Sequence, residues 1–207
     1  MKKFFSLAIV AMLAVSASAQ ITWNAKLGGG FSFCAGMNDD GDTKAIFVGK
    51  IGVGIEKPLT ENISLMPSLE VAIKGTKWSY KEDGYSADET LNPIYVQIPI
   101  LGAYRFNLDD DWNLTFKVGP YFAYGVAGDA KYKGKDASGN TYSETESLFG
   151  DFDAKRFDAG VDVGIDFEYH RFVFGAEFER GFMSFSPDDA DFNIYNQAFY
   201  VTLGYKF

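Results

Sequence analysis

The last eleven residues, Gln197-Ala-Phe-Tyr-Val-Thr-Leu-Gly-Tyr-Lys-Phe207, decide how the rest of the chain is interpreted. In an extended strand, alternate side chains point to opposite faces. One face of this stretch is apolar throughout and consists of Phe199, Val201, Leu203, Tyr205 and Phe207. The other face is mixed. The period of two therefore predicts a β-strand with one side against an apolar environment. The apolar face includes the terminal residue, which a soluble domain rarely leaves at a frayed end.

The same alternation recurs along the chain. The segment from Phe157 to Tyr169 shows it most clearly, because its apolar positions alternate with Asp158, Asp162 and Asp166. No 3.6-residue periodicity follows residue 20. We predict about eight strands, at residues 22–33, 47–56, 63–74, 94–106, 114–126, 157–169, 172–179 and 197–207. The pattern predicts an all-β fold, an eight-stranded antiparallel up-and-down transmembrane β-barrel.

The first nineteen residues have the three parts of a secretory signal peptide. Lys2 and Lys3 form the basic start, residues 7–15 the apolar core, and residues 17–19 the small-residue cleavage site. The apolar core is too short for a membrane-spanning helix. We therefore predict a cleaved signal peptide at residues 1–19 and one exported β-barrel domain at residues 20–207.

Composition agrees with a barrel. The chain of 207 residues contains 20 Phe, 12 Tyr and 22 Gly, and its mean hydropathy is only −0.09, because alternate residues of a barrel strand face lipid and lumen. The single cysteine, Cys34, excludes an intramolecular disulfide. Removing Lys2 and Lys3 reduces 19 basic residues to 17 against 28 acidic ones, a net charge of −11. This balance argues against a nucleic-acid partner.

Connection lengths predict the orientation in the membrane. The connections after the second, fourth and sixth strands are short, and the others are long and polar, the longest being residues 128–156. Short periplasmic turns and long external loops are typical of such barrels, so both termini should be periplasmic. We predict an inner aromatic girdle of Trp23, Tyr104, Phe106, Trp112, Phe167, Phe172, Tyr205 and Phe207. The predicted outer girdle contains Phe33, Phe47, Trp78, Tyr80, Phe122, Tyr124, Phe157 and Tyr195. Pro67, Pro99 and Pro120 fall inside strands and are expected at bulges or bends.

Two strands carry a family resemblance. Tyr95-Val-Gln-Ile-Pro-Ile-Leu-Gly-Ala-Tyr-Arg-Phe106 and Lys117-Val-Gly-Pro-Tyr-Phe-Ala-Tyr-Gly125 resemble recurrent strands of the small outer-membrane β-barrel proteins of Bacteroidota, the PorT-like family. The resemblance covers essentially the whole mature chain and implies a location in the bacterial cell outer membrane. The final strand likewise resembles the closing strand of outer-membrane barrels. It implies that the barrel assembly machinery reads the apolar face listed above, Phe207 included, during biogenesis.

The mixed faces of the strands place charged groups in the lumen. The basic ones are Lys26, Lys50, Lys74, Arg105, Lys117 and Lys206, and the acidic ones are Glu56, Glu70, Asp158, Asp162, Asp166, Glu168, Glu177 and Glu179. An eight-stranded barrel is only wide enough for side chains to fill. We therefore favour a salt-bridged plug over an ion or proton path.

Catalytic and metal motifs are weak. His170 is the only histidine, and no Gly-x-Ser-x-Gly motif is present, so we predict no enzyme and no cofactor. The acidic loops at residues 39–42 and 188–191 lack the ligand spacing of a calcium loop. The predicted function is a structural or surface-interaction role through the external loops. The predicted partners are outer-membrane lipid, lipopolysaccharide and an unidentified molecule that binds the loops. A narrow-lumen transporter for small solutes or apolar molecules, and an accessory subunit of a secretion or assembly system, remain alternatives.

Overall fold

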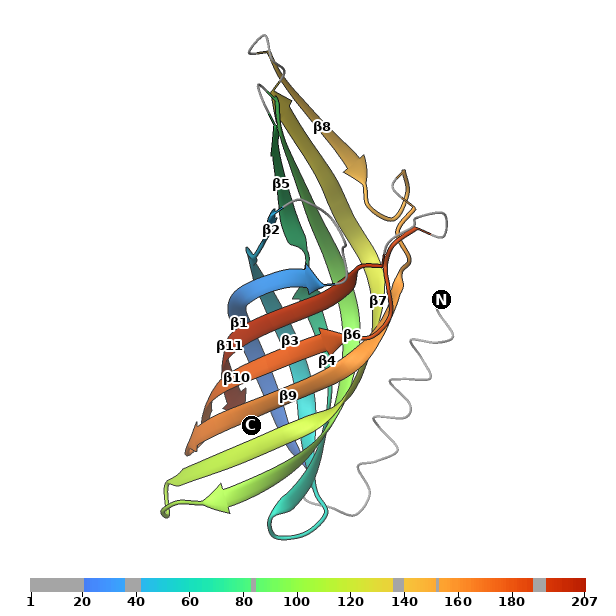
Figure 1. The fold of residues 1–207 in the computed structure, drawn as a ribbon. Coiled ribbons are helices and arrows are strands. Elements are labelled where there is room, and N and C mark those ends of the chain that lie inside the picture. Colours follow the sequence, from blue (N-terminus) through green and yellow to red (C-terminus); the bar gives the residue numbers. More distant parts are fainter. Residues whose placement is uncertain (1–20, 36–41, 83–84, 136–139, 152, 188–192) are drawn as a thin grey trace.

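The computed structural model describes residues 21–35, 42–82, 85–135, 140–151, 153–187 and 193–207, whose strands form one antiparallel sheet (Figure 1). The strands are β1 (Thr22–Ala35), β2 (Asp42–Lys44), β3 (Ile46–Pro58), β4 (Ile63–Ile73), β5 (Thr76–Glu82), β6 (Tyr85–Asn107), β7 (Trp112–Lys135), β8 (Thr141–Ser147), β9 (Phe157–Tyr169), β10 (Phe172–Gly181) and β11 (Tyr195–Lys206). The described part of the chain contains no helix of the length and apolarity needed to cross a bilayer. The signal peptide predicted for residues 1–19 lies outside the described residues.

Eight of the described strands close into a ring, because each pairs with two others. Their order is β1, β3, β4, β6, β7, β9, β10 and β11. The ring closes where β11 pairs with β1, from Asn24 opposite Lys206 to Ala35 opposite Tyr195. Closure removes the free edges of the ring, so its main-chain groups are paired within the wall. The antiparallel β-barrel predicted from the alternation is therefore confirmed.

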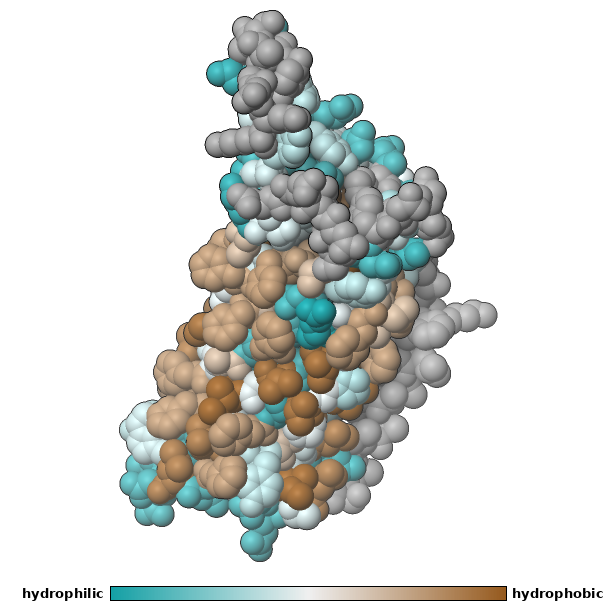
Figure 2. All heavy atoms as spheres, viewed as in Figure 1, coloured by the Kyte–Doolittle hydropathy of each residue, from teal (hydrophilic) through white to brown (hydrophobic). Residues whose placement is uncertain are grey.

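The two faces of the wall differ as the alternation requires. Outward side chains are exposed, for example Leu27 at 57%, Ile51 at 62% and Val201 at 61%, whereas inward neighbours such as Glu177 are buried. Figure 2 shows the apolar side chains as a band across the visible face of the barrel, with polar side chains toward both ends. Such a band is the surface that faces lipid.

Aromatic rings gather at the end of the barrel that carries the short turns. Trp112 lies 4.4 Å from Tyr169 between ring centroids, and Tyr205 lies 5.4 Å from Phe207. This end agrees with the predicted inner girdle. Two residues of the predicted outer girdle are misplaced. Trp78 is only 9% exposed and packs in the interior, and Tyr80 lies on the same face of β5, beyond the barrel.

The short turns and the closing strand meet at one end, as Figure 1 shows. His170, in the turn between β9 and β10, has a positive φ of 52°, which allows a two-residue hairpin. The N–H of Phe207 donates to the carbonyl of Trp23 at 2.8 Å, so the start of β1 and the end of β11 lie side by side.

A second part of the sheet extends beyond the barrel at the opposite end (Figure 1). β6 and β7 are 23 and 24 residues long, and their far halves pair with each other, with β5 and with β8. We call β2, β5, residues 85–93, residues 127–135 and β8 the protruding sheet. Long polar connections were predicted after the third strand and, at residues 128–156, after the fifth, and this prediction was wrong over most of both segments. Water contacts the outer face there, so the apolar alternation that marks a membrane strand is lost.

The three prolines do not cause bulges. Each one lies opposite an interruption in one hydrogen-bonded ladder: Pro67 between β3 and β4, Pro99 between β4 and β6, and Pro120 between β6 and β7. The register is the same on both sides of every interruption, so none of these prolines lies at a bulge, and the bends that were predicted as the alternative stay a prediction. The shift in register lies between Ile94 and Tyr95 instead, where β7 contains one additional residue.

Candidate functional site

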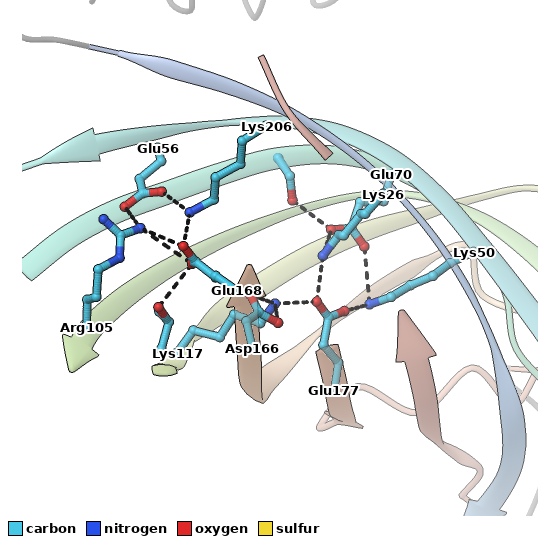
Figure 3. Close-up of polar contacts among 12 residues, drawn as sticks. Lys26, Lys50, Glu56, Glu70, Arg105, Lys117, Asp166, Glu168, Glu177 and Lys206 are labelled. Carbon is cyan, nitrogen blue, oxygen red and sulfur yellow. Dashed lines mark hydrogen bonds and ion pairs between the residues drawn. The ribbon is translucent and has the colours of Figure 1, made fainter. Parts of the chain in front are cut away.

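The structure places all fourteen charged residues predicted for the lumen inside the barrel, in the arrangement that Figure 3 shows in part. Glycines on the inward faces make room for their long stems. A Cβ at Gly52 would lie 2.6 Å from Cγ of Glu70, and a Cβ at Gly164 would lie 2.6 Å from Cε of Lys117. Small and long inward residues therefore fit together and fill the bore.

The first cluster lies toward the short turns. Arg105 contacts Glu56 at 2.6 Å and Glu168 at 3.4 Å, and Lys206 contacts the same two carboxylates at 2.7 and 2.8 Å. Two cations alternate with two anions from four strands, so the cluster crosses the lumen. The guanidinium is the most exposed group of the four, with a side-chain exposure of 24%.

The second cluster occupies the middle of the lumen. Lys26 bridges Glu70 at 2.7 Å and Glu177 at 2.8 Å, and Lys50 contacts Glu70, Glu177 and Glu179. One oxygen from each of these three glutamates lies within 4.8 Å of the others. The ammonium groups of Lys26, Lys50 and Lys74 all contact this group, so three cations balance its three carboxylates.

Lys117 connects the middle cluster to β9. Its ammonium lies 2.7 Å from Asp166 and 2.6 Å from Glu177, and its side chain is 5% exposed. Lys117 is the ion-pair partner of Asp166 among the described residues, whereas Glu177 also has Lys26 and Lys50. Loss of the Lys117 ammonium would therefore leave Asp166 without an ion-pair partner among the described residues, whereas Glu177 would keep two.

The third cluster lies toward the protruding sheet. Lys74 contacts Glu179 at 2.8 Å and lies 4.0 Å from the ring centroid of Tyr121. The hydroxyl of Tyr121 donates to Asp158 at 3.0 Å, and the amide of Asn196 donates to the same carboxylate at 3.0 Å. Both hydrogen bonds reach Oδ2, and Lys74, the one cation paired with this carboxylate among the described residues, lies 3.9 Å from the same oxygen. Oδ1 is buried without a hydrogen-bond partner in the described part of the chain. Tyr121 and Asn196 were not predicted as site residues, although Tyr121 stands on the inward face of its strand.

Asp162 differs from the other lumen carboxylates. It is fully buried, and neither of its oxygens has a hydrogen-bond partner among the described residues. Its cross-strand partner in β10 is Glu179, and its partner in β7 is Gly119. Burial of an anion without a partner is costly. This position therefore reduces the stability of the plug.

Apolar side chains close the lumen at the mouth below the protruding sheet. Tyr95 from the wall lies 6.2 Å from Phe149 between ring centroids, and Leu148, Phe185 and Ile194 are buried in the same cluster. Phe149 and Phe185 come from segments predicted as polar loops, so sequence analysis missed this closure. The available signal was a pair of large apolar residues, Leu148 and Phe149, inside an otherwise polar stretch.

A small cavity remains between the clusters. Its volume is about 40 Å³, and its lining includes Lys26, Met66, Lys117, Asp166 and Lys206. A space of that size holds roughly three water molecules. It separates charged clusters and is too small for a solute.

The protruding sheet carries its own polar contacts. Lys77 and Ser79 donate to Asp88 at 2.9 and 2.7 Å, and these hydrogen bonds hold the pKa of Asp88 below its ordinary value. On the opposite face, burial raises the pKa of Glu89, and the nearby Glu146 carboxylate adds to the effect. Asp88 is thus already neutralised by Lys77.

The residues predicted as the assembly signal lie on the outer face of β11. Phe199, Val201, Leu203 and Phe207 are between 42% and 68% exposed, and Tyr205 is partly exposed beside Phe207. They form a lipid-facing row along the closing strand. Their recognition by the assembly machinery stays a prediction.

Known protein families include one whose model matches most of this chain. A family model described as "Outer membrane protein beta-barrel domain" matches residues 6–186. The chain belongs to this outer-membrane β-barrel family. The family places the protein in the bacterial outer membrane, as predicted from the strands and the closing residue. The narrower resemblance to the PorT-like proteins of Bacteroidota stays a prediction. None of the curated proteins compared with this sequence shows significant similarity to it.

Solved structures of similar architecture include three outer-membrane proteins. The attachment invasion locus protein Ail of Yersinia pestis, in complex with the heparin analogue sucrose octasulfate, is 14% identical with a TM-score of 0.45, over 91% of this chain and 99% of that one. OprG of Pseudomonas aeruginosa is 9% identical with a TM-score of 0.44, over 91% and 98%. Neisserial surface protein A is 12% identical with a TM-score of 0.40, over 91% and 99%.

Proposed function

We propose that this family member is a non-enzymatic outer-membrane barrel that makes contacts at the cell surface through its protruding sheet. The observation that carries the proposal is the sheet itself, which extends β6 and β7 far beyond the lipid-facing band. Its last strand, β8, pairs with β7 on one side. Among the described strands, none pairs with its other edge.

An unpaired edge is chemically suited to binding. Its free N–H and C=O groups can pair with an extended segment of another protein, and exposed side chains select that segment. Every residue of β8 except Glu146 is exposed, and Tyr142 is 59% exposed. Tyrosine contributes a large, rigid contact surface with a polar tip. We propose that the unidentified partner docks at this edge.

The filled lumen also supports a surface role, because it disfavours transport through the barrel. Three ion-paired clusters and an apolar closure occupy the bore, and they leave a cavity of about 40 Å³. A transporter for small solutes needs a continuous path. The plug therefore disfavours the transport alternative, and no observation favours an accessory role in secretion.

The closing strand supports a proposal about biogenesis. The lipid-facing row from Phe199 to Phe207 has the alternation that the barrel assembly machinery reads in similar strands. We propose that this row is the recognition signal during membrane insertion.

Removal of the tip of the protruding sheet tests the surface role. Replacing residues 131–145 with Asn-Gly joins Ala130 to Glu146, which already lie opposite each other, through a favourable two-residue turn. Cells with equal amounts of folded wild-type or trimmed barrel are compared for attachment to immobilised matrix proteins and glycans. We expect the trimmed barrel to lose attachment to at least one of them. Equal attachment of both strains to every surface would contradict the proposal.

A further inference from the structure

The outward face of the protruding sheet is unusually basic for this acidic chain. The bulge near Ile94 changes which residues of β7 point outward, so Lys131, Lys133 and Lys135 continue the face that Tyr124 and Val126 present to lipid below. Asp129 lies on the same face at the end nearest the barrel. Cross-strand pairing adds further residues to this face: Lys44, Lys77, Ser79, Ser86, Asp88, Thr90, Thr141, Ser143 and Thr145. We call this set the outer lysine face. Because it has no large apolar residue, it is suited to a polar ligand.

Positive charges outnumber negative charges on the outer lysine face. Lys77 is paired with Asp88 at 2.9 Å, so that anion is already neutralised. Lys131, Lys133 and Lys135 are exposed, and within the described ranges no ion pair joins them to another residue. They repeat every second residue along one strand, which spaces them about 7 Å apart. A protein with a formal net charge of −9 thus presents three free cations in a row.

A surface groove lies within the outer lysine face. Its volume is about 420 Å³, and its lining includes Ser86, Asp88, Lys133, Lys135, Thr141 and Ser143. Two lysines and three hydroxyl-bearing residues therefore line one space, beside the ring of Tyr142 and the carboxylate of Asp88. Ammonium and hydroxyl donors are the groups that bind phosphate and sugar oxygens.

The position of the face relative to the bilayer identifies the ligand. Val126 is the last lipid-facing residue of β7 before the bulge. At about 3.3 Å per residue, Lys131 lies about 16 Å and Lys135 about 30 Å farther along the strand. Because barrel strands tilt by about 35–45°, the height above the lipid-facing band is about 11–13 Å for Lys131 and about 21–25 Å for Lys135. These heights exceed the roughly 5–8 Å of polar region that phospholipid headgroups add, so they reach the level of the sugars that a glycolipid carries beyond its membrane anchor.

We infer that the outer lysine face is a binding site for the phosphorylated saccharide of an outer-leaflet glycolipid. The face looks outward from the same wall that contacts lipid, so the molecules beside it are the lipids that surround the barrel. A soluble polyanion would have to enter between the sheet and that lipid layer. Attraction to the lipid phosphates would also hold the sheet at a fixed tilt above the membrane. The inference does not depend on a partner at β8.

The test uses the full mature barrel in zwitterionic detergent. Rough lipopolysaccharide with a phosphorylated core saccharide and the same molecule after removal of its core phosphates are titrated at low salt, and binding is followed by thermophoresis. The variant K133Q/K135Q removes two cations from the groove, and K133R/K135R retains them. The matched control K57Q/R171Q removes two positive charges from the turns at the other end. Folding of every variant is checked by its heat-dependent mobility on gels.

We expect wild type, K133R/K135R and K57Q/R171Q to bind the phosphorylated form alike, with affinity that decreases as salt increases. K133Q/K135Q should bind it roughly tenfold more weakly, since each lysine near an anionic surface contributes several-fold in affinity. Equal binding by K133Q/K135Q, or equal binding of the dephosphorylated form, would overturn the inference. Displacement of the phosphorylated lipopolysaccharide by a soluble sulfated oligosaccharide at an equal molar concentration would also overturn it, because the ligand would then come from outside the membrane.

Discussion

Replacing Lys117 with methionine tests the energetics of the lumen. The substitution keeps the length of the stem but removes the ammonium that contacts Asp166 at 2.7 Å and Glu177 at 2.6 Å. Glu177 keeps Lys26 and Lys50, whereas Asp166 has no other cationic partner among the described residues. The main cost is therefore one buried carboxylate left uncompensated, which destabilises a protein by about 3–5 kcal/mol.

The double variant Lys117→Met with Asp166→Asn isolates that cost. It removes both members of the pair, so the free energy of unfolding should fall by only about 1–2 kcal/mol, the size of a lost hydrogen bond. The control Lys57→Met changes a lysine in the turn region of β3 and should change stability by less than about 0.5 kcal/mol. The measurement is equilibrium urea unfolding of barrels refolded into lipid vesicles, followed by tryptophan fluorescence. If Lys117→Met costs less than about 1 kcal/mol, or the double variant is no more stable than the single one, the lumen charges are not a buried pair network.

Three other perturbations have defined outcomes. Trypsin added to intact cells should cut the hairpin of β7 and β8 first, because it is exposed and rich in lysine; first cleavage at Lys57 or Arg171 would show the opposite orientation. Deleting Phe207 should reduce the folded yield in cells far more than refolding into detergent, because one exposed aromatic residue adds at most roughly 1.5–3 kcal/mol to the finished barrel; equal losses in both assays would assign the residue to packing alone. Asp162→Asn should leave thermal stability unchanged or raise it, because both oxygens of Asp162 are buried without a hydrogen-bond partner among the described residues; a marked loss of stability would reveal a partner for this carboxylate.

The barrel could be predicted because lipid imposes a regular pattern on a strand. Within the membrane every second residue must be apolar, and β9 and β11 follow this rule without exception in their central parts. The same rule assigns the other positions to the lumen. Inward charges such as Lys26 and Glu177 could therefore be found from the sequence alone.

The pairing of those charges could not be predicted. Lys26 and Glu177 are 151 residues apart, and their contact depends on the stagger of all strands around the ring. The alternation fixes which face a residue takes but not its height in the lumen. Tyr121 and Asn196 were missed as site residues for the same reason.

The protruding sheet was missed because its environment changes at the membrane surface. Beyond Val126 both faces of β7 leave the lipid, and its outward positions become Lys131, Lys133 and Lys135. A polar outer face resembles a loop in composition, although the strand continues unbroken. The burial of Trp78 in the interior depends on the same extension, because β5 turns its ring toward the closed mouth.

Conductance of the purified barrel in a planar bilayer tests the central claim most directly. Ion-paired clusters and the apolar closure at Tyr95 and Phe149 fill the bore, so the account predicts no steady current from the wild-type protein. Arg105→Ala removes one of the two cations that join Glu56 to Glu168, and it should lower thermal stability. Reproducible single-channel steps from the wild type, with stability unchanged by Arg105→Ala, would contradict the plug and establish a transport path.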